Sequence, residues 1–434
     1  MARFASLHEW LSWQETLHAK PIDLGLDRCR PVVERMGLGN TRLPIVTVAG
    51  TNGKGSAVAM LEAILQAAGY RTGAYTSPHL VRYNERIRVA GAEVDDATIM
   101  AAFERIDRVR GPTSLTYFEF ATLAAMDIFH RMRLDVAILE VGLGGRLDAV
   151  NLFDADVALV TTVDIDHVRW LGPDRESIGR EKAGIFRPHH PAVLGDARPV
   201  ASLEQYAKEL ATPLYRLGVE FTCSTHERGW DWVSQAGVLR ALPRPALVGS
   251  FQVANAAAVL MALTLLCQRR TALKVPAAAI RQGLAAVRLP GRFQILEGRP
   301  ERVLDVAHNP QAAETLAEML RQRRCHGRTL VVLAMLADKD LAGVVAPLQG
   351  VSQMWYVASL HVGRGASAAV LVATIQQAQA RACVYAFDTV TEAYRAAVAD
   401  AAVEDRVVVL GSFYAVGEIL QLERDASATA AVGS

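Results

Sequence analysis

Short apolar runs alternate with amphipathic stretches along most of the chain. Residues 44–50, 135–142 and 157–164 read PIVTVAG, DVAILEVG and VALVTTVD, and a helical pattern follows the first run from Gly53 to Gly69. Strands that are apolar at nearly every position are typical of a parallel sheet covered on both faces. The pattern therefore predicts an α/β fold with a mostly parallel sheet.

A second, smaller alternation of strands and helices begins after residues 286–292. This segment reads AVRLPGR and places Pro and Gly between two periodic regions, which is typical of a domain boundary. After it come VLDVAHN, TLVVLAML, MWYVAS, CVYAF and VVVLGS, each followed by a helical stretch. We predict one domain over residues 1–287 and a smaller, Rossmann-like, doubly wound domain over residues 288–434.

Two stretches of the first domain break this alternation. Residues 220–245 alternate aromatic and polar side chains around ERGW, and we expect an antiparallel hairpin at the edge of the sheet. Residues 256–267 form the longest apolar run, which is shorter than the roughly 20 residues that span a bilayer. We interpret this run as a buried helix and expect no membrane partner.

Composition and charge restrict the class of protein further. A chain of 434 residues exceeds one hydrophobic core, and 51% hydrophobic with 21% charged residues is an ordinary globular balance. The formal charge is +1, and no basic run marks a surface for nucleic acid. We expect small-molecule partners, no nucleic acid and a monomer.

The cysteines and the start of the chain indicate the compartment. Five cysteines lie far apart without CxxC or metal-ligand spacing, so we expect reduced thiols. The first 15 residues, MARFASLHEWLSWQE, lack the apolar run of a signal peptide. Both features favour a cytoplasmic protein.

The strongest local motif joins a strand to a helix through GTNGKGS at residues 50–56. Glycines let successive backbone N–H groups surround an anion, the helix N-terminus adds partial positive charge, and Lys54 can reach the outer phosphates of ATP. The strict motif has Ser or Thr directly after the lysine, whereas here Gly55 intervenes and Ser56 supplies the hydroxyl. We interpret the segment as a variant P-loop, against the alternative of a glycine-rich turn with a surface lysine.

A phosphate loop needs a cation, and acids at neighbouring strand ends are expected ligands of Mg²⁺. Glu140 closes DVAILE, and the segment VDIDHVRWLG delivers Asp164, Asp166 and His167 in a turn. An imidazole beside a phosphate site can ligate a divalent ion. The alternatives are a capping or ion-paired acid and a structural histidine.

Several motifs now occur in one order along the chain: GTNGKGS, TSPHLVRYNERI, EVGLGGRLDAVN, DHVRWLG, EKAGI, LPGRF and DVAHNP. Their order and spacing resemble those of folylpolyglutamate synthases, particularly bacterial ones that are also dihydrofolate synthases. The resemblance extends from IDLGLDR at residues 22–28 to GSFYAVGEIL at residues 411–420. The ATP-binding core is similar to that of the cell-wall Mur ligases, whereas TSPHL belongs to the folate branch.

The resemblance implies a role for each matching position. It implies nucleotide contacts at Thr51, Asn52, Gly53, Lys54, Gly55, Ser56, Asn255, Arg292 and Asp305. It implies magnesium ligands at Ser56, Ser77, Glu140 and His167, and a carbamate on Lys182. It implies catalytic roles for Lys54, His167, Lys182 and His308. It implies pterin and benzoate contacts at Asp23, Leu24, Gly25, Leu26, Thr116, Tyr117, Phe118, Glu119, Leu147, Asp148 and Ala149, with His308 and Ser412 where glutamate is expected.

The implied reaction is an ATP- and Mg²⁺-dependent ligation of L-glutamate. The acceptors would be dihydropteroate, giving dihydrofolate, and folates, giving folylpolyglutamates, through an acyl phosphate. Residues 1–287 would bind ATP and folate, and residues 288–434 would form the glutamate ligase domain. One departure concerns Phe251, because family members commonly have His before the Gln that precedes the ATP-contacting Asn.

Other functions remain as alternatives. A monofunctional folylpolyglutamate synthase would lack the dihydropteroate reaction. Another Mur-type amino-acid ligase would carry a nucleotide-sugar domain before the P-loop, yet only 49 residues precede Gly50. A P-loop GTPase would need NKxD, which the sequence lacks, and a folate-binding protein without catalysis would not need Glu140, His167 and Lys182 together.

Overall fold

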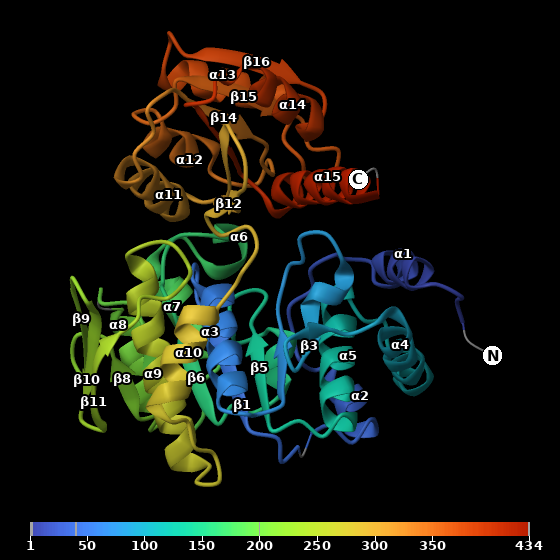
Figure 1. Ribbon diagram of the computed structural model, residues 1–434. Coiled ribbons are helices and arrows are strands. Elements are labelled where there is room, and N and C mark those ends of the chain that lie inside the picture. Colours follow the sequence, from blue (N-terminus) through green and yellow to red (C-terminus); the bar gives the residue numbers. More distant parts are fainter. Residues whose placement is uncertain (1–2, 40, 199, 433–434) are drawn as a thin grey trace. The chain divides into compact units, whose positions relative to one another are not determined.

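The computed structural model describes residues 3–39, 41–198 and 200–432 and divides the chain into two compact units (Figure 1). The first unit contains Met1–Pro78, Tyr83–Ala246 and Ser250–Arg288. The second contains His79–Arg82, Leu247–Gly249 and Leu289–Ser434. Two short segments that the sequence assigned to the first domain therefore pack with the C-terminal part of the chain.

An eight-stranded sheet forms the centre of the first unit, in the order β4-β3-β2-β5-β1-β6-β7-β8. Its strands are β1 (Ile45–Ala49), β2 (Thr72–Tyr75), β3 (Ile87–Val89), β4 (Ala92–Glu93), β5 (Val136–Glu140), β6 (Val157–Val160), β7 (Ala192–Leu194) and β8 (Leu214–Arg216). Six neighbouring strands pair in parallel: β2, β5, β1, β6, β7 and β8. At one edge, β3 pairs antiparallel with β2, and β4 pairs antiparallel with β3. The expected mostly parallel sheet is confirmed.

Helices cover this sheet, and its central strands β1, β2, β5, β6 and β7 are buried along their whole length. The helices are α1 (Leu7–Leu17), α2 (Arg30–Arg35), α3 (Lys54–Ala67), α4 (Asp96–Arg110), α5 (Tyr117–Arg131), α6 (Val168–Leu171), α7 (Arg175–Ala183), α8 (Ala201–Glu209), α9 (Phe251–Arg269) and α10 (Ala277–Ala286), with short 3₁₀ helices η1 (Tyr83–Arg86) and η2 (Ala149–Leu152). On β1, Ile45 and Ala49 belong to the core that also contains Phe120 of α5. Side chains alternate between the faces of a strand, so Val46 and Val48 point to the opposite face. There α3 packs against the sheet and against α9 and α10 (Figure 1).

The interior helix α9 confirms the expectation for residues 256–267. In the described part of the chain it is the one helix long and apolar enough to cross a membrane, with a mean hydropathy of 1.6. Within the fold, however, 72% of that stretch is buried. This degree of burial is that of a core helix in a globular unit.

The hairpin predicted over residues 220–245 is wrong in its placement. The segment forms a separate three-stranded antiparallel sheet of β9 (Phe221–His226), β10 (Gly229–Ser234) and β11 (Gly237–Leu242). Trp230 and Trp232 are buried, and the indole N–H of Trp232 donates to the carbonyl of Ala257 in α9 at 3.1 Å. Periodicity shows that strands are present, but the surface against which they pack depends on the tertiary fold.

The second unit is a doubly wound sheet in the order β12-β13-β17-β14-β15-β16. Its strands are β12 (Gln294–Leu296), β13 (Glu301–Leu304), β14 (Thr329–Leu333), β15 (Met354–Ala358), β16 (Cys383–Phe387) and β17 (Arg406–Leu410), and its helices are α11 (Pro310–Gln322), α12 (Leu341–Leu348), α13 (Ala368–Ala378), α14 (Val390–Asp400) and α15 (Phe413–Val432). All neighbouring strands pair in parallel except β12 with β13. The predicted small Rossmann-like sheet is confirmed.

The order of strands brings three carboxyl ends together in the first unit. β1 lies between β5 and β6, and Val48 pairs with Glu140 while Ala49 pairs with Val160. The segments that follow these strands therefore meet at one edge of the sheet. Ligands of open α/β sheets bind outside the carboxyl ends of the strands.

Candidate active site

The loop between β1 and α3 is built from glycines at the positions where no other residue fits. Gly50 has φ +149°, and a Cβ there would lie 1.9 Å from Oγ1 of Thr161. Gly53 has φ +86° in the left-handed region, where a side chain is strained. The loop thus lies directly against the segment that follows β6.

Hydrogen bonds hold this loop in place. The backbone N–H of Thr51 donates to the carbonyl of Thr162 at 2.7 Å, and its hydroxyl donates to the carbonyl of Asp164 at 2.9 Å. The backbone N–H of Asn52 donates to Oγ1 of Thr162 at 3.1 Å. A loop anchored in this way keeps its conformation before a ligand binds, which lowers the entropic cost of binding.

Lys54 begins α3 and folds back over the loop. Its Nζ donates to the carbonyl of Gly50 at 3.0 Å and to that of Thr51 at 3.2 Å. The ammonium group therefore lies beside the N-terminus of α3, where the helix dipole also favours negative charge. The predicted variant P-loop has the geometry of a phosphate site.

A buried hydrogen-bond chain connects the P-loop to α9. Nε2 of Gln252 donates to Oγ of Ser56 at 3.2 Å, and Nδ2 of Asn255 donates to Oε1 of Gln252 at 3.1 Å. A Cβ on Gly53 would approach Oδ1 of Asn255 to 2.9 Å. The structure thus places Asn255 beside the loop and Gln252 between Asn255 and Ser56, while the contact of Asn255 with the nucleotide stays a prediction.

Glu140 and Ser77 are brought together from different strand ends. Glu140 ends β5 and is buried, and its Oε2 accepts a hydrogen bond from the backbone N–H of Ser77 at 3.2 Å. A carboxylate and a hydroxyl are oxygen donors, which Mg²⁺ prefers. In the described residues, no three His, Cys, Asp or Glu side chains form a metal-binding group. The donor set therefore fits a hard ion that also takes oxygens from phosphate and water.

His167 lies in the turn after β6. It adopts φ +52°, an uncommon conformation for a residue other than glycine, and caps the short helix α6. Its Nε2 is 3.9 Å from Oδ2 of Asp166, and its side chain is 34% exposed. The ring is therefore accessible to a ligand, and its charged neighbour is Asp166, which the sequence delivers in the same turn.

Lys182 is buried in the last turn of α7, with 3% of its surface exposed. Burial and repulsion by Lys54 lower its pKa to about 7, although attraction from Asp166 acts in the opposite direction. Burial disfavours a charged ammonium because water no longer solvates it. Lys182 is therefore not a surface lysine.

The loop after β5 packs against the end of α7. The backbone N–H of Arg146 donates to the carbonyl of Glu181 at 2.9 Å. A Cβ on Gly145 would lie 2.9 Å from the carbonyl oxygens of both Glu181 and Lys182. The glycines of EVGLGGR thus allow the close approach that the EKAGI segment needs.

The three segments predicted to bind the pteroate portion also meet. The backbone N–H of Gly25 donates to the carbonyl of Leu147 at 3.2 Å. A Cβ on Gly142 would lie 2.6 Å from the ring of Phe118 and 3.3 Å from Oδ2 of Asp148. Burial raises the pKa of Asp148 to about 7, against hydrogen bonds from backbone N–H groups. Asp148 therefore serves first to hold its own loop.

Arg28 connects two of these segments and was not among the predicted residues. Its Nη1 donates to Oδ2 of Asp23 at 2.7 Å, and its Nη2 donates to Oε1 of Glu119 at 2.5 Å. Glu119 also accepts from the backbone N–H of Thr116 at 2.7 Å. Arg28 lies in IDLGLDR, but its partner 91 residues away has no local signal.

In the second unit, Arg292 and His308 lie against Phe413. The guanidinium carbon of Arg292 is 5.4 Å from the centre of the Phe413 ring, and the ring of His308 is 6.1 Å from it. Asp305 accepts from the backbone N–H groups of Phe293 and Ala307, both at 2.8 Å. Burial raises the pKa of Asp305 although Arg292 opposes this shift.

Ser412 is buried in the same unit. Its hydroxyl donates to the carbonyl of Ala334 at 3.0 Å and accepts from the backbone N–H of Ala415 at 3.0 Å. These bonds hold the start of α15. A direct contact of Ser412 with glutamate stays a prediction.

Comparison with known proteins identifies the family to which the chain belongs. Residues 48–263 match the Mur ligase middle domain, and residues 291–413 match the Mur ligase, glutamate ligase domain. The chain is 47% identical over 416 residues to the dihydrofolate synthase/folylpolyglutamate synthase of Escherichia coli K12, with 96% of this chain and 95% of the relative covered.

Two solved structures are similar to the whole chain. Escherichia coli FolC in complex with DHPP and ADP has a TM-score of 0.92 at 46% identity and covers 98% of this chain and 99% of its own. A bifunctional folylpolyglutamate synthase/dihydrofolate synthase with Mn, AMPPNP and L-glutamate bound has a TM-score of 0.88 at 45% identity, covering 97% and 98%.

Proposed function

The chain belongs to the dihydrofolate synthase/folylpolyglutamate synthase family of Mur ligases, and from this we infer that it ligates L-glutamate to dihydropteroate and to folates at the expense of ATP. The observation that supports this most strongly is the convergence of the P-loop, Glu140 and the buried Lys182 in the first unit. A carboxylate is a poor electrophile, so it has to be activated by phosphorylation before an amine can attack it. A site for ATP phosphates is therefore expected in an enzyme that joins a carboxylate to an amine.

The reaction has two chemical steps. A carboxylate oxygen of the acceptor attacks the γ-phosphorus of ATP, and the bond to the bridging oxygen breaks, giving an acyl phosphate and ADP. The neutral amine of glutamate then attacks the acyl carbon, the amide forms, and phosphate leaves with the electron pair of the broken C–O bond and takes up the proton that the amine nitrogen loses. Phosphoryl transfer of this kind depends on positioning and charge neutralisation more than on covalent help.

The residues of the first unit divide this work. Lys54 and the N-terminus of α3 neutralise and orient the phosphates. Thr51 and Asn52 bind the nucleotide from a loop that their backbone N–H groups anchor to Thr162, and Gly53 and Gly55 allow the phosphates to approach this loop closely. Asn255 supports the loop from α9.

Magnesium fits the oxygen donors of this site. We propose that Ser56, Ser77, Glu140 and His167 would hold it, with a carbamate on Lys182. When bound, the ion supplies positive charge that offsets the charge of the phosphates. The buried carboxylate of Glu140 beside Ser77 supports this assignment because a buried charge calls for a partner.

The acceptor binds three segments, of which Arg28 connects the first two. They comprise Asp23, Leu24, Gly25 and Leu26, then Thr116, Tyr117, Phe118 and Glu119, and finally Leu147, Asp148 and Ala149. The contact between Gly25 and Leu147 supports a single binding surface. In the second unit, Arg292 and Asp305 bind the nucleotide, and His308 and Ser412 serve the incoming glutamate. The protein acts as a cytoplasmic monomer.

One assay tests the proposed function. Purified protein with dihydropteroate, L-glutamate, ATP and Mg²⁺ is expected to release ADP and form dihydrofolate, and with tetrahydrofolate to form the diglutamate. Extension of folates without reaction of dihydropteroate would identify a monofunctional folylpolyglutamate synthase instead. ATP hydrolysis without any ligated product would contradict ligase activity altogether.

A further inference from the structure

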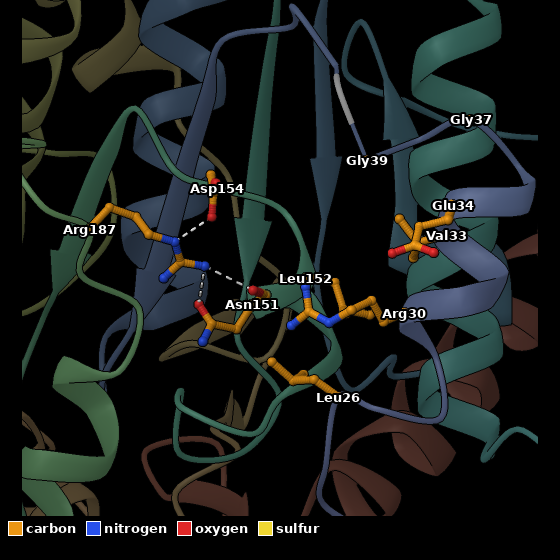
Figure 2. A pocket seen from close by; sticks show the side chains of 10 residues that line it. All are labelled: Leu26, Arg30, Val33, Glu34, Gly37, Gly39, Asn151, Leu152, Asp154 and Arg187. Atoms are coloured by element: carbon orange, nitrogen blue, oxygen red, sulfur yellow. Dashed lines mark hydrogen bonds and ion pairs between the residues drawn. The ribbon is translucent and has the colours of Figure 1, made fainter.

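A cavity of about 660 Å³ lies in the first unit beside α2 (Figure 2). Its lining consists of Leu26, Arg30, Val33, Glu34, Gly37 and Gly39 on one side and Asn151, Leu152, Asp154 and Arg187 on the other. A volume of this size is typical of sites for small organic ligands. None of the predicted nucleotide or metal residues lines it.

The cavity borders the first of the segments proposed to bind pteroate. Leu26 is the last residue of the first of these segments, and it also lines the cavity. Asn151 lines the opposite wall, and its Nδ2 donates to the carbonyl of Arg146 at 3.0 Å. Leu26 and Asn151 thus place the two walls next to the ends of two pteroate segments. These two segments are joined by the hydrogen bond from Gly25 to Leu147.

One wall of the cavity is fixed by hydrogen bonds. The guanidinium of Arg187 donates to Oδ1 of Asn151 at 3.0 Å and to the carbonyl of the same residue at 2.9 Å, and it also pairs with Asp154 (Figure 2). The guanidinium also donates to the carbonyl of Phe186 at 3.0 Å. Arg187 thus has its hydrogen-bonding capacity largely used within the fold.

The opposite wall presents a different pair of charges. Arg30 and Glu34 lie one turn apart on the α2 side, both exposed. Within the described residues, neither side chain has a hydrogen-bond or ion-pair partner, and Figure 2 draws no dashed line to either. A ligand in the cavity can therefore bind the guanidinium of Arg30 and the carboxylate of Glu34. Leu26, Val33 and Leu152 add apolar lining.

Repeated ligation creates a need for such a place. Each γ-linked glutamate lengthens the chain between the pteridine ring and the carboxylate that reacts next. That carboxylate must return to the same phosphate each time, so the ring has to lie farther from the P-loop after every round. A substrate with several glutamates therefore cannot keep its ring where dihydropteroate has it.

We propose that this cavity is a distal subsite for the pteridine ring of folates that already carry several glutamates. Glu34 accepts hydrogen bonds from the 2-amino group and N3–H of the ring, and Arg30 donates to its 4-oxo group. The lining pairs two arginines with two acids, which suits a neutral ring better than the anionic glutamate chain. The inference rests on the proposed function.

The test compares acceptors of different length. Glu34→Gln and Arg30→Met are expected to raise the KM for triglutamyl tetrahydrofolate about tenfold each, because a hydrogen bond to a charged group is lost. The KM for dihydropteroate is expected to stay at the parent value. Glu15→Gln and Arg108→Met change exposed residues of α1 and α4 and serve as matched controls that alter neither KM.

A third variant fills the cavity without touching the charged pair. Gly39 has no left-handed φ, and a Cβ there would meet only Cγ1 of Val33 at 3.9 Å. Gly39→Phe is therefore expected to raise the KM for the triglutamate and to leave dihydropteroate unaffected.

Three results would overturn the proposal. Equal KM values for the triglutamate in parent, Glu34→Gln and Arg30→Met would show that the cavity takes no part. An equal rise for both acceptors would make it part of the pteroate site. A higher KM for the triglutamate in Arg30→Met together with a lower KM in Glu34→Gln would identify the anionic glutamate chain as the occupant. Failure of the parent to ligate dihydropteroate would instead contradict the proposed function.

Discussion

Lys182 is buried close enough to Lys54 for their positive charges to repel each other. Burial is the larger cause and this repulsion the second in lowering the pKa of Lys182 to about 7. A substantial neutral fraction at physiological pH follows, and a neutral amine can react with CO₂ to give a carbamate. The modification would replace an unfavourable positive charge beside Lys54 with a favourable negative one.

Lys182→Ala is expected to lower the rate of ligation by about a hundredfold or more, because charge stabilisation at the phosphates is lost. Acetate, which can occupy the vacated space, is expected to restore part of the rate. Lys182→Arg keeps the positive charge, forms no carbamate and is expected to stay inactive. Steady-state rates and the mass of the protein kept under CO₂ provide the measurement.

The matched control for this series is Lys208→Ala, because Lys208 is an exposed lysine of α8. It is expected to retain the parent rate. Parent-like activity of Lys182→Ala or Lys182→Arg with both acceptors would rule out the carbamate.

The stability of the unmodified protein is expected to rise with pH above about 7. The unfolded chain keeps Lys182 protonated up to its ordinary pKa of 10.5, whereas the folded chain releases the proton near pH 7. Between these values the unfolded state binds more protons, so the free energy of unfolding increases with pH. The free energies of unfolding of the parent and of Lys182→Met, measured in urea without CO₂ and Mg²⁺, should differ less at pH 10 than at pH 7. A pH-independent difference would show that Lys182 is not titrated in this range.

Gly53→Ala is expected to impair nucleotide binding beyond its effect on stability. Gly53 has φ +86°, and an added Cβ would lie 2.9 Å from Oδ1 of Asn255. Gly69 has a similar φ of +89° with no atom within 4 Å of the added Cβ, so Gly69→Ala measures the backbone strain alone. Both variants should lose about 1 kcal/mol or more of stability in urea unfolding. Only Gly53→Ala should raise the KM for ATP, and an equal KM in both variants would contradict the role of the contact.

Gln252→Leu is expected to raise the KM for ATP about tenfold, because Ser56 and Asn255 would lose a buried partner worth about 1–3 kcal/mol. The KM for the folate acceptor should stay close to the parent value. Gln205→Leu replaces an exposed glutamine of α8 and provides the control. Unchanged ATP kinetics in Gln252→Leu would mean that the chain from α9 does not support the P-loop.

Arg28→Met is expected to raise the KM for dihydropteroate while the KM for ATP stays unchanged. The substitution leaves the buried Glu119 without the guanidinium that also holds Asp23. Loss of one partner of a buried ion pair costs about 3–5 kcal/mol, so a lower midpoint of urea unfolding is expected as well. Arg28→Lys cannot bridge both carboxylates and should recover only part of the affinity. Equal changes in both KM values would indicate a general structural role.

The sequence was sufficient to predict the features that depend on residues close together in the chain. Apolar runs of strand length predicted β1 and β5 within two residues, because a strand covered on both faces needs hydrophobic side chains at every position. β6 ends at Val160 rather than at residue 164, since the last residues of the run turn to anchor the P-loop. The P-loop itself was predictable because its glycines and lysine act locally.

Tertiary structure alone decided the contacts between residues far apart in the sequence. Gln252 reaches Ser56 across 196 positions, and Arg28 reaches Glu119 across 91. The placement of the sheet of β9, β10 and β11 and the cavity beside Arg30 also follow from packing. The burial that lowers the pKa of Lys182 belongs to this group, because its helix shows no sign of it in composition. Local conformation follows from side-chain chemistry, whereas burial and long-range partners follow from how the elements pack together.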